Sequence, residues 1–369
     1  MFDDDLEREL DREFGDDERA KSAMRADLVA MHDHDTTDTA PAHTLIARKV
    51  WTALRDLGIG GGQMLVLGQD AELFAGVPVD ERRLPPGERA GFTATIPATV
   101  PRRPGLAPHP NLRLRAWHGG SGDPDRYDVV VAVPGYCDVA LHRADAVASR
   151  RVEQILGLVG CLANTEPGGF TVGLVSHDVM DGPDSDARRL LTEFGELVGA
   201  VRLPSGALRE DPGTDAVVDL LVLRRHDGTP LAPHQFLRAP TRTVGGQWVR
   251  VNDYFRHNPH QVLGRLSARA TPWGQAELVV HASGLGLNRD LTAGLAAVTA
   301  HARRTGLTAA TERSLDVDAP IDYTLVHHDD LDSARREISR LRDAASQEPQ
   351  IPGPGPAAPR PDDGIGPTR

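Results

Sequence analysis

Residues 127–142 restrict the fold of this chain more than any other stretch. Within them, residues 128–133 form a β-branched, nearly all-apolar run, which is typical of a parallel strand buried on both faces. Pro134 and Gly135 then predict a sharp turn. Because ligands of open α/β sheets bind beyond the carboxyl ends of such strands, we expect the functional site where this strand ends. The candidate residues there are Ala132, Val133, Pro134, Gly135 and Tyr136.

Strands alternate with helices through most of residues 44–225. Apolar runs predict strands at residues 64–67, 92–96, 112–116, 128–133, 170–176, 197–203 and 217–223. Helical periodicity marks residues 44–57 and 152–162, and Ser185 is a candidate cap for a further helix. The alternation predicts an α/β class fold, with a doubly wound, mainly parallel sheet of about seven strands.

The two ends of the chain differ from this central part. Residues 3–32 have the apolar spacing of an amphipathic helix with an acidic outer face, which either packs on its own domain or docks onto a partner. The segment His32, Asp33, His34, Asp35 follows; we expect a solvated linker there, with a metal site as the alternative. After residue 225 we expect one strand, at 277–280, and helices at 289–304 and 330–345.

These patterns divide the chain into four parts. Residues 1–42 form the acidic helix and a linker, residues 43–226 the α/β domain, and residues 227–346 a small α+β extension. Residues 347–369 are rich in Pro and Gly and cannot bury a core, so we expect a disordered tail.

Composition excludes several classes of function. A net charge of −12 argues against nucleic-acid binding through overall charge, although local basic patches remain possible. Two cysteines, Cys137 and Cys161, cannot build a metal-binding framework. The N-terminus has no secretion signal, and no apolar run reaches the ~18 residues that a membrane span needs, so we expect a cytoplasmic protein without membrane contact.

The segment after the first predicted strand is where a nucleotide-type cofactor would bind. Such a cofactor requires glycines, because backbone N–H groups must approach it closely. Gly68 and Gly76 bound this segment with no glycine between them, and Asp70 and Glu72 add negative charge. The second strand also ends without the carboxylate that would bind ribose hydroxyls. The sequence therefore predicts weak or absent cofactor binding.

Several segments nevertheless resemble the N6-adenine DNA methyltransferase-like domain of large helicase–methyltransferase proteins of bacteria, phages and plasmids, especially of actinobacterial type. The matching region runs from about residue 43 to 285, roughly two thirds of the chain. Its most specific segments are residues 197–205, 213–225 and 251–255.

The resemblance implies a class I methyltransferase (Rossmann-like) sheet, S-adenosylmethionine as cofactor if the protein is active, and DNA as a partner. It also implies an association with a helicase or an intact methyltransferase. The cofactor positions that it suggests are Gly68, Asp70, Phe74 and Gly76.

The chain departs from the family pattern in the catalytic motif and in the cofactor loop. The family has Asn or Asp, Pro, Pro or another small residue and then an aromatic, so that the polar group holds the target amino group and the aromatic stacks on the flipped base. Here Ala132 takes the polar position and the aromatic is displaced to Tyr136, while the cofactor loop is two residues shorter and lacks the glycine pair. Each preorganised contact is worth ~3 kcal/mol in a transition state, so together these losses predict an inactive enzyme without a cofactor.

Three functions remain open on the sequence. The first is a catalytically dead methyltransferase fold that acts as a DNA-handling, scaffolding or regulatory subunit. The second is an active adenine methyltransferase in which Tyr136 stacks the base and Asp138 or Asp128 accepts its protons; the simpler interpretation makes Asp138 a turn residue and Tyr136 a partly buried aromatic. The third is a protein-interaction module that acts through the terminal helices.

Overall fold

The computed structural model describes residues 4–79, 92–97, 112–115, 126–183, 185–209, 216–227 and 236–309. The α-helices are α1 (Asp4–Phe14), α2 (Glu18–Thr36), α3 (Ala40–Asp56), α4 (Ala71–Val79), α5 (Ala144–Asn164), α6 (Asp178–Asp181), α7 (Ser185–Phe194), α8 (Asp253–His257) and α9 (Leu287–Thr305), and η2 (Pro259–Gln261) is a 3₁₀ helix. The strands of the main sheet are β1 (Gly62–Gly68), β2 (Phe92–Pro97), β3 (Leu112–Arg115), β4 (Tyr127–Val133), β5 (Thr165–Ser176), β6 (Gly195–Arg202) and β7 (Val218–Arg225). Two hairpins follow, β8 (Thr241–Val244) with β9 (Gln247–Arg250) and β10 (Gly264–Ala270) with β11 (Ala276–Ala282). The expected helix at 330–345 and the tail at 347–369 lie outside the described residues.

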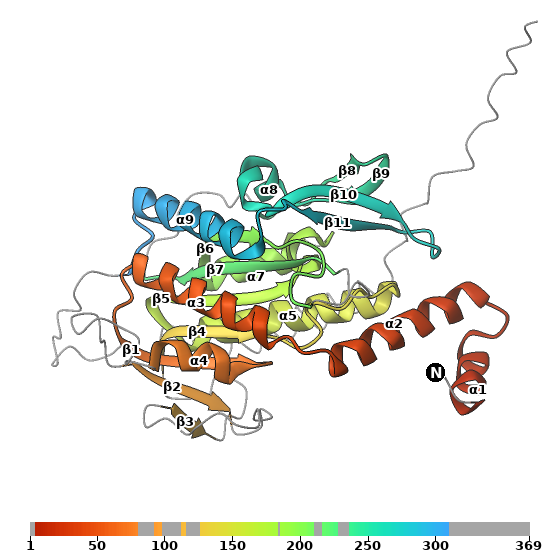
Figure 1. The fold of residues 1–369 in the computed structure, drawn as a ribbon, viewed down its shortest axis with the longest axis horizontal. Coiled ribbons are helices and arrows are strands. Elements are labelled where there is room, and N and C mark those ends of the chain that lie inside the picture. Colours follow the sequence, from red (N-terminus) through yellow and green to blue (C-terminus); the bar gives the residue numbers. More distant parts are fainter. Residues whose placement is uncertain are drawn as a thin grey trace, which may run out of the picture.

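The main sheet has seven strands in the order β3-β2-β1-β4-β5-β7-β6. Its strands are parallel except for β7, which pairs antiparallel with both β5 and β6. The predictions of about seven strands and of a central strand at residues 129–133 are confirmed, since β4 lies between β1 and β5. Figure 1 shows α3 and α4 in front of this sheet, with α5 behind it.

Both faces of the sheet are covered, which explains the nearly continuous apolar sequence of β4. Val129, Val131 and Val133 pack in one cluster with residues of α3, α4 and α9. Val130 and Ala132 point to the other face, toward Cys161 of α5. Helices α5 and α7 bury their apolar residues on this second face, together with the two hairpins.

The N-terminal segment forms two helices rather than the single helix expected at residues 3–32. Gly15, with φ at +55°, lets α1 end. The side chain of Asp17 then accepts hydrogen bonds from the backbone N–H groups of Arg19 and Ala20, at 3.1 and 3.0 Å, and caps α2. Gly15 and the cap at Asp17 thus divide the segment into two helices, although the apolar periodicity continues across both.

The strand expected at 277–280 is confirmed as part of β11, but the described part of the extension contains three further strands, β8, β9 and β10. The first hairpin turns at Gly245 and Gly246, which both have positive φ, as two-residue hairpin loops require. The other expected boundary, between residues 42 and 43, falls within α3. Helix α9 then crosses back over the sheet and contacts α3 and β6.

A buried ionic network joins the extension to the sheet. Arg202 of β6 lies 2.7 Å from a carboxylate oxygen of Asp219 and 2.9 Å from one of Asp181, and its guanidinium carbon lies 4.0 Å from the centroid of the Phe255 ring. The backbone N–H of Asn252 donates to Asp181 at 2.8 Å. This buried network therefore connects the three segments that carry the family resemblance, which are residues 197–205, 213–225 and 251–255.

Candidate functional site

The ends of β1 and β4 form the topological switch point of the sheet, because the strand order reverses between them. Gly68 of β1 is in register with Val133 of β4. A Cβ atom on Gly68 would lie 1.9 Å from the carbonyl oxygen of Val133, and the next residue, Gln69, donates its N–H to the same oxygen at 2.8 Å. The fold therefore brings the predicted cofactor loop and the predicted catalytic loop together at one point.

Both loops contain a strained residue. In the described ranges, Asp70 (φ +51°) and Tyr136 (φ +58°) are the non-glycine residues with positive φ, and each lies just after one of the two strands. Asp70 thus adopts a backbone conformation that glycine adopts at little cost. Such strain gathers at functional sites, because the surrounding structure must hold it in place.

Residues of α3 hold the side chain of Asp70. The hydroxyl of Thr39 donates to Oδ2 of Asp70 at 2.7 Å, and Nδ1 of His43 lies 2.8 Å from the same oxygen. Thr39 and His43 are both buried, and the His43 ring packs against Phe74 with ring centroids 5.7 Å apart. The start of α3 therefore covers the end of β1.

The four suggested cofactor residues fall into two groups. Gly68 and Asp70 lie at the end of β1, whereas Phe74 and Gly76 lie within α4. Phe74 is buried in the main core, and a Cβ atom on Gly76 would meet open space. Only the first pair lies where a cofactor would approach the backbone.

The catalytic-motif residues are split between the strand and its loop. Ala132 and Val133 are buried within β4, and Ala132 packs in the small apolar cluster that includes Leu65 and Cys161. Pro134 and Gly135 follow the strand, and Tyr136 is 37% exposed. The position that would carry the acceptor of an adenine amino group therefore lies in apolar surroundings.

The ring of Tyr136 stacks on a residue of the chain's own N-terminal segment. Its centroid lies 4.6 Å from that of the His34 ring, at an interplanar angle of 35°. His34 is buried in the last turns of α2, so the expectation of a solvated linker at residues 32–35 was wrong. The partner that buries His34 is more than a hundred residues away in the sequence, which local patterns cannot reveal.

That partner is Asp138, which lies in the loop after β4. Nδ1 of His34 lies 2.9 Å from Oδ1 of Asp138, and Nε of Arg209 donates to Oδ2. Burial by itself raises the pKa of Asp138, but the bonds from His34 and Arg209 outweigh burial and lower the pKa to about 2. Asp138 therefore lies in the turn at residues 135–138, as the simpler interpretation expected, and is in addition an ionised member of a buried cluster.

Arg209 also closes the end of α2. Its Nη1 donates to the carbonyl oxygens of Asp33, His34 and Thr37, at 3.3, 3.1 and 3.3 Å. Carbonyl groups in the last turn of a helix lack partners within the helix, and a cation there also interacts favourably with the helix dipole. One guanidinium thus joins α2 to the loops after β4 and β6.

A second contact fixes α2 further along the same loop. Oδ1 of Asp27 accepts a hydrogen bond from the backbone N–H of His142 at 2.6 Å, and Oδ2 accepts one from the N–H of Arg143 at 3.1 Å. Asp27 therefore caps the start of α5 from another helix. Asp27 and His34 are seven residues apart, hence on one face of α2, and together they fasten that face along residues 136–143.

Asp138 and Asp128, the two candidate acceptors in an active adenine methyltransferase, both bond other groups of the chain. Asp138 is paired with His34 and Arg209, as described above. Asp128 lies at the opposite end of β4, where its Oδ2 accepts the backbone N–H of Gln63 at 2.9 Å. The neighbouring Cys137 offers no nucleophile either, because burial raises the pKa of its thiol.

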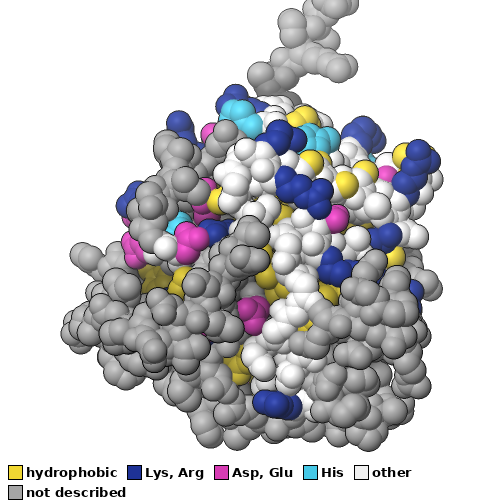
Figure 2. All heavy atoms as spheres, turned by 90° about the vertical axis from the view of Figure 1, so that its left-hand side faces the viewer, with side chains coloured by type: hydrophobic (Ala, Val, Ile, Leu, Met, Phe, Trp, Pro, Cys, Tyr) yellow, Lys and Arg dark blue, Asp and Glu magenta, His cyan; other side chains and the backbone are white. Residues whose placement is uncertain are grey.

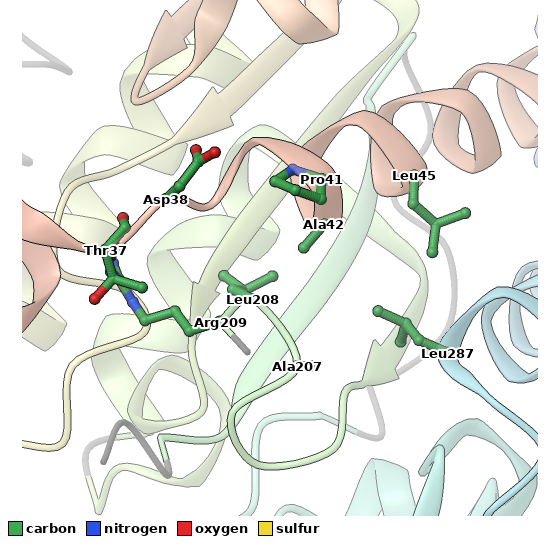
Figure 3. A pocket seen from close by; sticks show the side chains of 9 residues that line it. All are labelled: Thr37, Asp38, Pro41, Ala42, Leu45, Ala207, Leu208, Arg209 and Leu287. Carbon is green, nitrogen blue, oxygen red and sulfur yellow. Dashed lines mark hydrogen bonds between the residues drawn. The ribbon is translucent and has the colours of Figure 1, made fainter. Parts of the chain in front are cut away.

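A cavity of about 630 Å³ lies beside this closed region, beyond the end of β6. Figure 3 shows Thr37 and Arg209 at one end and Leu45 and Leu287 at the other, with Asp38 above. Its walls come from the segment that joins α2 to α3, the first turns of α3, the loop after β6 and the start of α9. Among the described residues, no group of three or more His, Cys, Asp or Glu side chains could hold a metal ion, and no helix is long and apolar enough to cross a membrane.

No family model and no curated protein matches the sequence. Among solved structures, the chain is similar to a protein from Listeria monocytogenes assigned as a class I S-adenosylmethionine-dependent methyltransferase, with 15% identity, a TM-score of 0.37, and coverage of 59% of this chain and 72% of that one. It is also similar to a modification subunit assigned to a type I restriction enzyme from Vibrio vulnificus YJ016, with 16% identity, a TM-score of 0.32, and coverage of 49% and 43%. A type I restriction–modification assembly matches with 14% identity, a TM-score of 0.33, and coverage of 82% and 64%.

Likeness at this level of identity concerns the fold alone. The chain itself is mixed α/β, with a doubly wound, mostly parallel sheet of seven strands, as the sequence predicts. The chain spans less than half the length of the Vibrio subunit.

Proposed function

We propose that this chain is a degenerate relative of N6-adenine DNA methyltransferases that has lost methyl transfer and acts as a DNA-handling, scaffolding or regulatory subunit. One observation carries the proposal: residues of the chain itself occupy the switch point of the sheet. Thr39 and His43 bond Asp70 at the end of β1, and His34 stacks on Tyr136 beyond the end of β4. A methyl donor and a flipped base would need these same two places.

The chemistry of the site supports the same conclusion. An adenine amino nitrogen is a poor nucleophile and requires a polar acceptor, yet position 132 is an alanine in an apolar cluster. Correct placement of donor and acceptor is worth many orders of magnitude in rate. Without the acceptor and the glycine loop, the chain has no means to hold the two reactants in line.

The strain at Asp70 and Tyr136 favours a second candidate, an active methyltransferase with a divergent motif at residues 133–136. Both positive φ angles lie at the switch point, where strain can serve catalysis. In that case S-adenosylmethionine would bind next to Gly68 and Asp70, and α2 would have to leave the site. The main proposal, that of an inactive subunit, includes two further points. The chain is divided into residues 1–42, 43–226 and 227–346, and it associates with a helicase or an intact methyltransferase.

Two measurements on the full chain separate the candidates. Calorimetry with S-adenosylmethionine should show no binding, and methyl transfer from a tritiated donor to mixed-sequence DNA should stay at background. Micromolar cofactor binding or methyl transfer by the wild type would refute the proposal and support the enzyme.

The variant Ala132→Asn restores the missing polar residue and serves as an internal test. We expect no methyl transfer from it, and a loss of about 1–3 kcal/mol of unfolding free energy, because the new amide lies in an apolar cluster without a partner. Chemical denaturation measures the loss. Methyl transfer by this variant and not by the wild type would show that S-adenosylmethionine can bind at the end of β1.

A further inference from the structure

Charge is strongly segregated along this acidic chain. Residues 236–309 contain nine arginines, no lysine and three acidic residues, which gives a formal net charge of +6, whereas the whole chain carries −12. Residues 1–39 contain fourteen acidic and five basic residues, a net charge of −9. Figure 1 shows α1 at the lower right and α9 at the upper left, so these two helices lie apart, whereas Arg19 of α2 donates a hydrogen bond to the backbone carbonyl of Trp273 between β10 and β11.

The positive charge of the extension lies on its outer surface. Figure 2 shows Lys, Arg and His side chains predominating over Asp and Glu across the upper described part of the face that it displays. We define the basic ridge by its exposed residues in the extension, which are Trp248, Arg256, His257, His260, Arg289, His301, Arg303 and Arg304.

The basic ridge is continuous from the β8–β9 hairpin to α9. Strand β9 leads directly into α8, and Asp253 at the start of α8 lies 2.6 Å from Nη2 of Arg242 and 3.6 Å from Nε of Arg256. Two guanidinium groups thus share a single carboxylate. The segment η2 that follows α8 contacts α9.

Two of the four arginines of the basic ridge have no ion-pair partner among the described residues, whereas Arg256 lies 3.6 Å from Asp253 and Arg303 lies 3.2 Å from Asp56. Arg289 and Arg304 are exposed, and neither has an ion-pair partner in the part of the chain that the structure describes. On α1, by contrast, Arg8 pairs with Asp5. Unpaired arginines at both ends of one helix produce a positive potential that attracts a polyanion.

An aromatic side chain stands at the other end of the basic ridge. Trp248 is 57% exposed, although the next residue, Val249, is buried against the second core cluster. Alternation along β9 therefore turns the Trp248 ring away from the protein, on the same side as Arg250. An exposed indole beside arginines is the arrangement on which an unpaired base stacks.

We propose that the basic ridge binds single-stranded nucleic acid, with phosphates on Arg256, Arg289 and Arg304 and a base stacked on Trp248. This inference goes beyond the proposed function and does not depend on it, because the ridge and the switch point share no residues. Overall negative charge does not oppose it, because α1, which carries six acidic and two basic residues, lies on the opposite side of the molecule from α9.

Fluorescence anisotropy of the full chain with labelled mixed-sequence 20-mers tests the proposal, with single-stranded DNA, single-stranded RNA and duplex DNA as probes. The triple variant R256Q/R289Q/R304Q should weaken binding and lower the slope of log K against log salt by about 2, since each phosphate contact on a single strand contributes about 0.7. Trp248→Ala should weaken binding about 5- to 150-fold with little change in that slope.

The matched control removes three exposed arginines elsewhere, in R8Q/R12Q/R48Q, and should leave binding unchanged. Thermal unfolding must show that all variants fold. The relative affinity of the DNA and RNA strands identifies which nucleic acid is preferred.

Three results would overturn the proposal. They are no binding at low salt, equal binding by the ridge variants and the wild type, and tighter binding of duplex than of both single strands. Sedimentation supplies one further check: salt-sensitive self-association that the ridge variant abolishes, without nucleic-acid binding, would assign the basic ridge to the acidic segment of a second copy.

Discussion

Arg209 and Asp138 form a buried ion pair that fastens α2 across the end of β4. Both side chains are nearly inaccessible, at 1% and 5% relative exposure, and they come from loops after different strands. Because Arg209 also bonds three carbonyl groups of α2, this single pair couples the N-terminal segment to the candidate catalytic loop. Together with the contacts of Asp27 to residues 142 and 143, this pair holds α2 over the end of β4.

Asp138→Asn should loosen α2. The change leaves the Arg209 guanidinium buried without its countercharge, which typically costs about 3–5 kcal/mol. Hydrogen exchange should therefore accelerate in residues 18–36, more than in the strands of the main sheet. Asp186→Asn is the control, since Asp186 pairs with Arg189 on the exposed surface of α7; exchange as fast in that variant would contradict the role of Asp138.

The same pair predicts a loss of stability in acid. The pKa of Asp138 is lowered from 3.8 to about 2, so its contribution is fully present above pH ~4 and is lost as pH falls toward 2. The difference in unfolding free energy between wild type and Asp138→Asn should shrink over this range. A difference that stays constant from pH 5 to 2.5 would argue against an ionised Asp138 in the folded protein.

His177 predicts a loss of stability as pH rises above 6.5. Burial by itself lowers the pKa of His177, but the carboxylates of Asp178 and Asp181 outweigh burial and raise the pKa above 6.5. The stabilisation is therefore fully present below pH 6.5 and is lost as pH rises through the raised pKa. Denaturant midpoints should fall in this window for the wild type, and the fall should be smaller for His177→Gln.

Gly68→Ala should disrupt the switch point itself. The new Cβ would lie 1.9 Å from a backbone oxygen at a φ of +93°, so we expect a loss of at least about 2 kcal/mol in unfolding free energy. Gly76→Ala is the matched control: its Cβ meets open space within α4, and helix propensity predicts a gain of about 0.5–1 kcal/mol. Equal effects in the two variants would show that the strands can separate at Gly68.

The sequence by itself determined the sheet. The apolar run of residues 128–133 indicated a strand covered on both faces, and the alternation of strands with helices predicted a mainly parallel sheet. It also ended two strands at Leu67 and Val133, one residue and no residue from the observed ends Gly68 and Val133, and parallel strands that pair in register bring their ends together. Local patterns suffice for these features because hydrophobic periodicity and turn residues act over a few positions.

Only the tertiary structure decided what covers that sheet end. Within α2, Met24, Leu28 and Met31 have the apolar spacing of an amphipathic helix, yet the buried residues of the helix include Asp27 and His34. Buried polar groups require partners, and theirs are Asp138, His142 and Arg143, more than a hundred residues along the chain. No periodicity within the helix encodes such partners, because a hydrogen bond between distant segments depends on where the fold places both of them.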